Sequence, residues 1–347
     1  MPEREITDPV DLCDDRGRLN PAARGWSRRP LHNANLRRAV GRKKRWDYWC
    51  VLADDVIVSV TYADIDYAGL AGFWILDVAS GTEYEATMLS PFGRGIALPD
   101  MPCTGTVRAR TSNVEVEIAE RATGTTLTAF GRAVPKPRDG AEPVPASIRL
   151  VVDKPVGHES LNVVIPWSDR RFQFTSKQNT RRATGTVTLG QRTIHLGEHD
   201  RAMASQDLGR GIWPYANRWN WGAGSGHAVN GTLVGLQFGG RWTVGTGYTE
   251  NALCIDGRLT KIGEELEWTY DWDEPLKPWR VRTPTSEHVD VTLVPTHDRY
   301  SNTNLRVVSM EVHQCFGAWS GTIVDEHGRR LELDGVPGFA EEARNRW

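Results

Sequence analysis

The sequence predicts an all-β protein with very little helix. Apolar residues recur at every second position in many short runs, as Val114, Val116 and Ile118 do where they alternate with two glutamates. Gly, Pro, Asn or Asp interrupts these runs about every 8–12 residues, which is the spacing of strands and turns in a β-sandwich or barrel. Helical periodicity is nearly absent. These three observations favour an antiparallel sandwich or barrel.

Strand-like segments follow one another along the chain. After the run at 56–61 we expect strands at 105–110, 113–119, 125–130, 147–153, 161–166, 171–175, 184–189, 192–196, 229–238, 241–247, 251–256, 265–271, 288–294, 305–316, 319–324 and 330–334. The one helical candidate is the tail 338–347. There Phe339, Ala343 and Trp347 repeat every four residues and would share one helix face.

The length of the chain and a weak similarity between two of its segments indicate two β units. A chain of 347 residues favours two domains. AGLAGFWILDVASGTEYE and TENALCIDGRLTKIGEELEW each read as a strand, an Asp-centred turn and a returning strand. We expect an extended polar arm at 1–45, a first barrel at 46–190 and a second at 191–347. The break falls between Arg182 and Ser205, with the Pro-rich 134–145 loop as a rival.

Charge and cysteine content narrow the function classes. Lys plus Arg (42) nearly balances Asp plus Glu (44), which argues against nucleic acid as a partner. The basic run Arg37–Arg45 could meet an anionic headgroup at a membrane surface or pair with internal carboxylates. The five cysteines are dispersed without a CxxC pair, so neither zinc nor disulfides are indicated. No apolar run is long enough for a signal peptide or a membrane span, and we expect a cytoplasmic protein.

Cofactor and metal motifs are also missing from the sequence. Neither Gly-rich segment, GRGIALPD nor GAGSG, has the strand and helix context of a phosphate loop. His195 and His199 have a zinc-like spacing only on a helix, whereas their neighbours favour strand and turn. We therefore expect no cofactor and no metal.

The stretch from Ser205 to Gly226 carries the densest candidate chemistry. An acid, Asp207, and a base, Arg210, stand among five glycines and the aromatic residues Trp213, Tyr215, Trp219 and Trp221. In an aromatic pocket a carboxyl group loses hydration and its pKa rises, which suits a proton donor. A nearby arginine acts in the opposite direction. A structural Asp207–Arg210 pair in a Trp-rich core therefore remains an alternative.

Two other stretches offer groups to the same pocket. In GTGYTEN, Tyr248 and Glu250 share one strand face. In SMEVHQCFGAWSG, His313 shares a face with Glu311 and Cys315, and Trp319 follows. A lone strand histidine is also common in a satisfied core. Paired carboxylates among tryptophans are equally typical of a glycosidase cleft.

Several long motifs together resemble one bacterial family. They are GWSRRPLH, KKRWDYW, ESLNVVIPWSDRRFQFTSKQN, DLGRGIWPYANRWNWGAGSG, GYTENALCIDGRLTKI and FGAWSG. With these motifs the chain resembles the family catalogued as domain of unknown function 2804. More distantly, the Asp-x-Gly-Arg-Gly turn is similar to a motif of the AttH and carotenoid 1,2-hydratase group. That resemblance implies two tandem lipocalin-like antiparallel β-barrels with a hydrophobic cavity, and it places Asp207 where a proton reaches an alkene. Leu208 stands where that motif has a histidine.

Pattern and resemblance together favour a cofactor-independent acid–base enzyme, a lyase or isomerase such as a hydratase or cyclase. Its substrate would be a small, mainly apolar molecule held in a Trp-lined cavity. The expected catalytic residues are Asp207, Glu250 and His313, and the expected substrate-binding residues are Arg210, Trp213, Tyr215, Trp219, Trp221, Tyr248 and Trp319. Two alternatives stay open. A carrier of a hydrophobic ligand predicts carboxylates tied up in structural pairs, and a glycoside-acting enzyme predicts two free carboxyls in an open cleft.

Overall fold

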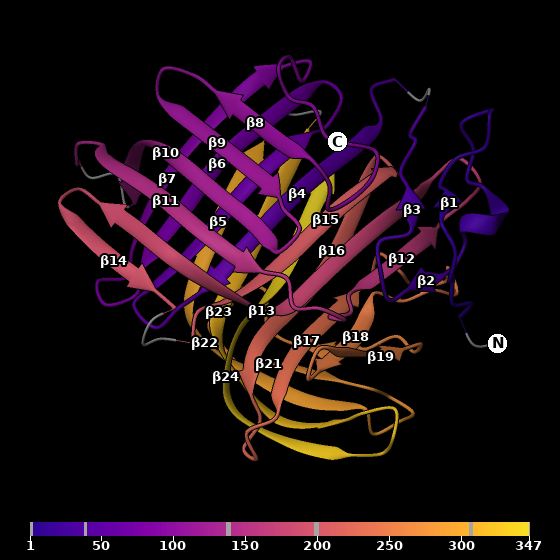
Figure 1. The fold of residues 1–347 in the computed structure, drawn as a ribbon. Helices are drawn as coiled ribbons and strands as arrows, with labels where there is room; N and C mark the ends of the chain where they lie inside the picture. The colour runs from indigo at the N-terminus through magenta and orange to yellow at the C-terminus, as the bar shows by residue number, and fades with distance from the viewer. Residues whose placement is uncertain (1–2, 38–39, 137–139, 198–200, 305–307, 347) are drawn as a thin grey trace.

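Two large antiparallel sheets make up the body of the protein (Figure 1). The computed structural model describes residues 3–37, 40–136, 140–197, 201–304 and 308–346. Arg38 of the basic run, His199, Trp347 and the start of the 305–316 strand lie outside these ranges. Within them, the sole helical element is the single 3₁₀ turn η1 (Pro21–Ala23). The all-β prediction is confirmed.

The first sheet closes on itself. Its ring runs through β13 (Phe172–Leu189), β15 (Met203–Ile212), β4 (Lys43–Leu52), β5 (Val56–Asp64), β6 (Ala68–Asp77), β7 (Thr82–Pro91), β10 (Gly124–Lys136) and β11 (Val144–Asp153), which pairs again with β13. Further strands extend this ring: β2 (Trp26–Ser27), β8 (Thr106–Arg110), β9 (Val114–Glu120), β12 (Leu161–Pro166) and β14 (Arg192–Leu196). Alternation along each strand fills the interior with Val, Ile and Leu side chains.

The second sheet is a half-barrel. Its strands stand in the order β19 (Arg258–Ile262), β18 (Asn251–Ile255), β17 (Leu233–Gly240), β16 (Ala216–His227), β24 (Arg330–Arg346), β23 (Ser309–Val324), β22 (Val289–Asn304), β21 (Trp279–Arg282) and β20 (Glu267–Thr269). The concave face holds a separate apolar cluster that includes Phe238, Trp279 and Trp319. This architecture confirms the prediction of two tandem β units.

The chain passes from the first sheet to the second between β15 and β16, so residues 203–212 complete the first ring. The sequence argument puts the boundary at residue 190. The N-terminal arm includes the short parallel pair of β1 (Val10–Asp11) and β3 (His32–Asn33). Apolar residues of the arm, such as Leu12 and Leu36, pack against Phe172 and Phe174 of β13.

The outer faces of the two sheets pack on each other. Cys50, Leu52 and Trp74 of the first sheet form one buried cluster with side chains of the second sheet, Trp221, Phe316 and Phe339 among them. The Trp74 and Phe316 rings are stacked with centroids 5.4 Å apart. This contact between the sheets is therefore a second, continuous core, and it positions the candidate site.

The predicted helix at 338–347 is wrong. Residues 338–346 belong to β24, which pairs with β16 on one side and β23 on the other. Residues four apart, such as Phe339 and Ala343, also share one face of a strand, so their spacing did not discriminate between the two structures. In the strand, Glu341 lies on the face of Phe339, toward the first sheet, and Glu342 lies on the opposite, concave face.

No helix of the described residues is long and apolar enough to cross a membrane. Nor do three or more His, Cys, Asp or Glu side chains gather as a metal site in the described ranges. His195 lies on the strand β14, as the neighbouring residues predict. All five cysteines are unbridged.

Candidate active site

A buried lysine between the two sheets holds two carboxylates. Lys177 extends from β13, and its Nζ lies 2.8 Å from Asp207 Oδ1 of β15 and 3.2 Å from Glu250 Oε1, just before β18. The side chains of Lys177 and Glu250 are only 4% and 3% exposed, while Asp207 is 14% exposed. Lys177 Nζ also lies 4.3 Å from the centroid of the Trp221 ring. The site thus combines ions from both sheets with an aromatic face.

Burial and mutual charge shift the proton affinities of these groups. Burial lowers the pKa of Lys177, but the charges of Asp207 and Glu250 outweigh it and raise that pKa above its ordinary value. For Glu250, burial is the largest effect and the charge of Asp207 adds to it, so its pKa rises to about 7 in spite of Lys177. Lys177 therefore favours its charged form, while Glu250 holds a proton more tightly than an ordinary glutamate.

A third carboxyl group, Glu341 of β24, faces the same site. It accepts a hydrogen bond of 2.8 Å from Trp219 Nε1. Burial, with a contribution from the charge of Asp207, raises the pKa of Glu341 to about 7. Among the described residues, no lysine or arginine lies within ion-pair distance of it. Glu341 is thus a desolvated acid that holds its proton more tightly than an ordinary glutamate.

Both oxygens of Asp207 are engaged by donors. Trp46 Nε1 of β4 donates to Oδ2 over 3.0 Å, and Thr175 Oγ1 of β13 lies 3.4 Å from Oδ1, the oxygen that also receives Lys177. Donors on both oxygens match an ionised carboxylate, which only accepts hydrogen bonds. Asp207 therefore has the surroundings of a fixed negative charge.

A cluster of tryptophans forms the neighbouring wall. Trp213 lies at its centre, with its ring centroid 4.9–5.8 Å from those of four other tryptophans among the described residues. The cluster consists of Trp46, Trp167, Trp213, Trp219 and Trp242. Two members of the cluster reach carboxyl groups through their indole N–H, Trp46 to Asp207 and Trp219 to Glu341. The aromatic wall and the acid groups are therefore one connected structure.

The glycines of the DLGRG segment make room for this wall. A Cβ at Gly209 would lie 2.2 Å from the Trp46 ring and 2.4 Å from Gln173 Nε2. A Cβ at Gly211 would lie 2.1 Å from Gln173 Oε1, the atom that accepts the Trp213 indole N–H. Close approach of side chains to the strand explains both glycines without a β-bulge, and the pairing register of β15 is continuous on both sides here.

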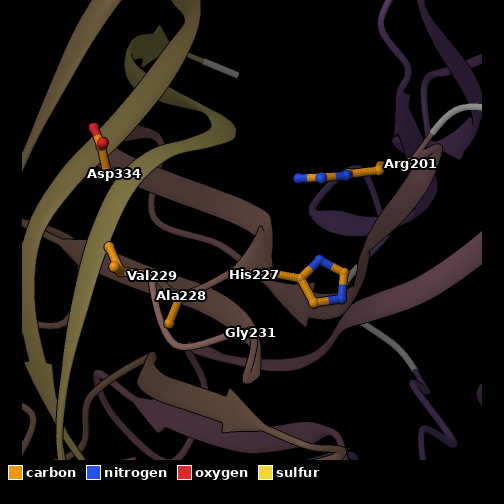
Figure 2. Close-up of a pocket in the computed structure, with 6 residues that line it drawn as sticks. All are labelled: Arg201, His227, Ala228, Val229, Gly231 and Asp334. Carbon is orange, nitrogen blue, oxygen red and sulfur yellow. The ribbon is translucent and has the colours of Figure 1, made fainter.

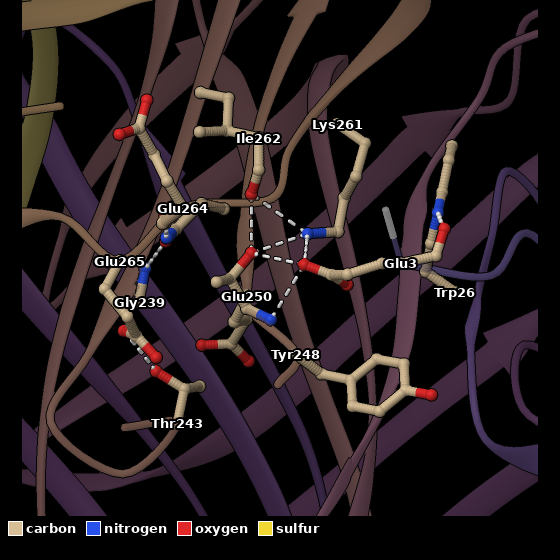
Figure 3. A network of polar contacts seen from close by, with 12 residues as sticks. Glu3, Trp26, Gly239, Thr243, Tyr248, Glu250, Lys261, Ile262, Glu264 and Glu265 are labelled. Carbon is tan, nitrogen blue, oxygen red and sulfur yellow. Dashed lines mark hydrogen bonds and ion pairs between the residues drawn. The ribbon is translucent and has the colours of Figure 1, made fainter. Parts of the chain in front are cut away.

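The segment that carries Glu250 is tied down by the N-terminal arm (Figure 3). Glu3 Oε1 accepts hydrogen bonds from the backbone N–H and the hydroxyl of Thr249, at 3.1 and 3.0 Å, and pairs with Lys261 Nζ at 2.8 Å. On the other side, Asn251 accepts from the Gly239 N–H and donates to the Glu264 carbonyl. Both neighbours of Glu250 in sequence are thereby fixed.

The structure brings together six of the ten sequence-derived site residues. Asp207, Glu250, Trp219 and Trp221 line the ionic site, Trp213 centres the aromatic cluster, and Tyr248 packs against that cluster. Lys177, Glu341 and Trp46 were missed. Lys177 could have been noticed as a single lysine in the strand-like run FQFTSKQ. Glu341 was missed because the sequence argument predicted a helix there.

The Asp207–Arg210 pair, which the sequence left open, does not form. Arg210 is wholly buried and pairs with Asp47 at 2.7 Å, with further hydrogen bonds to the Trp46 and Gly209 carbonyls. Because β15 is a regular strand, residues three apart face opposite sides of the sheet. Arg210 is thus separated from the ionic site by the sheet itself.

Three further residues also lie away from it. His313 is on the concave face of the half-barrel, where Nδ1 lies 2.7 Å from Asp298 Oδ2. Trp319 is buried in the core of that half-barrel and donates to the Ala223 carbonyl. Tyr215 is exposed. The proposed roles of His313 and Trp319 in this site therefore lack a geometric basis.

A pocket of about 540 Å³ lies elsewhere, at the far end of β16. It is lined by Arg201, His227, Ala228, Val229, Gly231 and Asp334, with Arg201 and His227 on one side and Asp334 on the other (Figure 2). It contains none of the acid groups or tryptophans described above, so the ionic site is the stronger candidate for chemistry.

The fold and the ionic site define a two-sheet β-protein with buried acid groups at the contact between the sheets. The chain belongs to the family described as Domain of unknown function (DUF2804), whose model matches residues 3–347. A comparison with curated proteins finds no match.

Solved structures with similar folds have low sequence identity. Kievitone hydratase from Nectria haematococca is 10% identical with a TM-score of 0.52, over 99% of this chain and 97% of that one. A protein of Nitrosomonas europaea assigned to AttH is 10% identical with a TM-score of 0.47, over 87% and 92%. CghA bound to Sch210972 is 13% identical with a TM-score of 0.45, over 88% and 89%. The likeness to kievitone hydratase supports the fold.

Proposed function

We propose that the protein is a cofactor-independent acid–base enzyme of the lyase or isomerase type, acting on a small, mainly apolar molecule at the contact between its two sheets. The observation that carries this proposal is the group of three carboxyls around Lys177, two of which have a pKa raised to about 7. A general acid works best when its pKa lies near the working pH. Kievitone hydratase, which has a similar fold, is by its name a hydratase.

In this proposal Glu341 is the proton donor. Its carboxyl proton passes to one carbon of a substrate double bond, forming a C–H bond and leaving a cation on the adjacent carbon. The faces of Trp219 and Trp221 stabilise that cation, as aromatic rings do for other cations. Attack by water followed by return of a proton to Glu341 completes a hydration, and loss of a neighbouring proton to the carboxylate completes an isomerisation. This gives Glu341 the role that the sequence argument gives to Asp207.

Asp207 and Glu250 have supporting roles in the same step. Asp207 supplies a fixed negative charge near the developing cation, held by Trp46, Thr175 and Lys177. Glu250, which shares Lys177, is a second proton reservoir. Preorganised charge of this kind, in a site that excludes water, stabilises a charged transition state more strongly than water does.

The two alternatives fit the described geometry less well. A carrier predicts that every carboxylate is held in an ion pair, but the Glu341 carboxyl accepts a hydrogen bond from the Trp219 indole N–H and has no ion-pair partner among the described residues. A glycosidase predicts two free carboxyls in an open cleft, whereas Asp207 and Glu250 share one lysine and are largely buried. Proton delivery from Glu341 remains the proposal that uses all three groups.

A deuterium-incorporation assay tests the proposal. The protein is incubated in D₂O with a panel of apolar terpenoid and prenyl-aromatic alkenes, and mass spectrometry measures carbon-bound deuterium in each. We expect at least one alkene to gain deuterium, and Glu341→Gln to slow that gain by about 10²–10⁴-fold. Glu287→Gln, at an exposed glutamate in the loop between β21 and β22, is the matched control. No incorporation above the enzyme-free rate across the panel, or incorporation unaffected by Glu341→Gln, would refute the assignment.

A further inference from the structure

Three arginines gather at one end of the half-barrel, on the concave face away from the acid site. Arg218 of β16 and Arg344 of β24 each bond through Nε to Glu342 Oε1, in the second case over 2.7 Å. Arg241, which follows β17, bonds through Nε to Asn220 Oδ1 over 2.8 Å and through Nη2 to Tyr270 Oη over 3.0 Å. β16 and β24 are adjacent strands (Figure 1), so these side chains share one patch.

The acceptors that hold these arginines are buried, while the arginines reach the surface. Glu342 and Asn220 are both 0% exposed. The side chains of Arg218 and Arg344 are 42% and 37% exposed, and Arg241 is exposed. Because Arg218 and Arg344 are anchored through Nε, their distal nitrogens are available to a ligand, while Arg241 uses Nε and Nη2 and keeps Nη1 available. Such anchoring preorganises the planar forks that bind oxyanions bidentately.

The patch carries surplus positive charge. Among the described residues, Glu342 is the one carboxylate within ion-pair distance of Arg218 and Arg344, and Arg241 has none. These three arginines and Glu342 together carry more positive than negative charge. Two further carboxylates lie nearby, Asp298 beside His313 at 2.7 Å and Glu311, which accepts a hydrogen bond from the Tyr300 hydroxyl.

Aromatic rings make the patch rigid. The Arg344 guanidinium lies 3.5 Å from the centroid of the Trp272 ring, and Tyr270 stacks on Trp279 with centroids 4.0 Å apart. The backbone of Arg241 is a further indication of a ligand-binding position. Its φ is +67°, a left-handed conformation that favours glycine. Glycine would relieve this strain, and backbone strain of this kind clusters at ligand-binding positions.

We propose that Arg218, Arg241 and Arg344 form a binding site for the phosphate group of a small molecule. The three guanidinium groups attract a phosphate anion, and the exposed forks supply its hydrogen-bond donors. Trp272 and Tyr270 would border the organic part of the ligand. This site is independent of the acid–base site, because Glu342 and Glu341 lie on opposite faces of β24.

Calorimetric titration with inorganic phosphate, and separately with acetate, tests the proposal. We expect saturable phosphate binding, weaker binding of acetate, and loss of about tenfold or more in phosphate affinity in Arg241→Gln. Arg282→Gln, at an exposed arginine of β21 that pairs with Glu267, should bind phosphate like the unaltered protein. Phosphate binding that does not saturate, or acetate binding as tight as that of phosphate, would overturn the assignment.

The variant Arg241→Gly separates binding from folding. Glycine accepts the left-handed backbone at residue 241, so we expect this variant to retain its melting temperature and to lose phosphate affinity as Arg241→Gln does. A lower melting temperature combined with unchanged phosphate affinity would give Arg241 a structural role and contradict the proposed site.

Discussion

One buried lysine governs the electrostatics of the contact between the sheets. Lys177 pairs directly with Asp207 and Glu250, and its charge also lowers the pKa of Glu341 against the larger effect of burial. Isolated buried carboxylates are costly, and pairing offsets that cost only while the lysine is present. The acidity of the site therefore depends on a residue that sequence analysis did not single out.

Replacing this lysine should strongly destabilise the fold. In Lys177→Met the apolar stem is kept, but Asp207 and Glu250 lose their shared cation. Breaking a buried pair in this way costs about 3–5 kcal/mol, which urea denaturation would detect. Lys277→Met is the control, because Lys277 forms only surface pairs with Asp271 and Glu274 and should matter little. Equal stability of the two variants would contradict the buried ionic site.

Gly209 tests the packing of the aromatic wall. In Gly209→Ala the new Cβ would overlap the Trp46 ring, and overpacking typically costs about 1–3 kcal/mol. Trp46 would also move from Asp207, which should change its fluorescence. Gly263→Ala, where the nearest atom is 3.6 Å away, should be close to neutral. A Gly209→Ala protein as stable as Gly263→Ala would show that Trp46 does not lie where described.

At the scale of elements, β24 decides what the site contains. A four-residue apolar repeat fits both a helix and a strand face, so local pattern could not exclude a helix at 338–347. Pairing with both β16 and β23 fixes the strand and its register. That register directs Glu341 to the acid site and Glu342 to the arginine patch. The error at the tail therefore concealed one key residue in each site.

The N-terminal arm holds the segment before β18 in place. In Glu3→Gln, Lys261 loses its ion pair while remaining buried, which should cost about 3–5 kcal/mol. The amide of Thr249, which donates to Glu3, should then exchange its hydrogen faster. Glu5→Gln, at a half-exposed pair with Arg28, should change stability by under about 1 kcal/mol. Unchanged exchange at Thr249 in Glu3→Gln would argue against this anchoring.

For the whole molecule, alternation and turn spacing were sufficient to predict two all-β units. The site could be predicted only in part. Asp207, Trp219 and Trp221 fall in one dense stretch of sequence, so local composition found them. Lys177 and Glu341 reach the site through pairings between strands distant in sequence, which no local pattern records. Arg210 and His313 are chemically suitable but face the opposite sides of their sheets.

The raised pKa values give global stability a definite pH dependence. Glu250 and Glu341 have a pKa of about 7 against an ordinary value of 4.5, so the folded protein binds their protons more tightly than the unfolded chain. Their stabilising contribution is full below about pH 4.5 and is lost as pH rises through about 7. Glu341→Gln, which cannot ionise, should lose less stability than the unaltered protein between about pH 5 and pH 8 in urea titrations. Equal losses in the two proteins would mean that Glu341 is ionised throughout this range and would contradict the raised pKa.

Infrared spectroscopy of the folded protein tests most directly whether the buried carboxyl groups of the site hold protons. A protonated carboxyl group absorbs as a distinct C=O stretch, separate from that of carboxylates. We expect this band to persist at about pH 6, to titrate near pH 7, and to diminish in Glu341→Gln and again when Glu250→Gln is added. No carboxylic-acid band above about pH 5.5, or a band that both substitutions leave intact, would contradict a proton held at this site for catalysis.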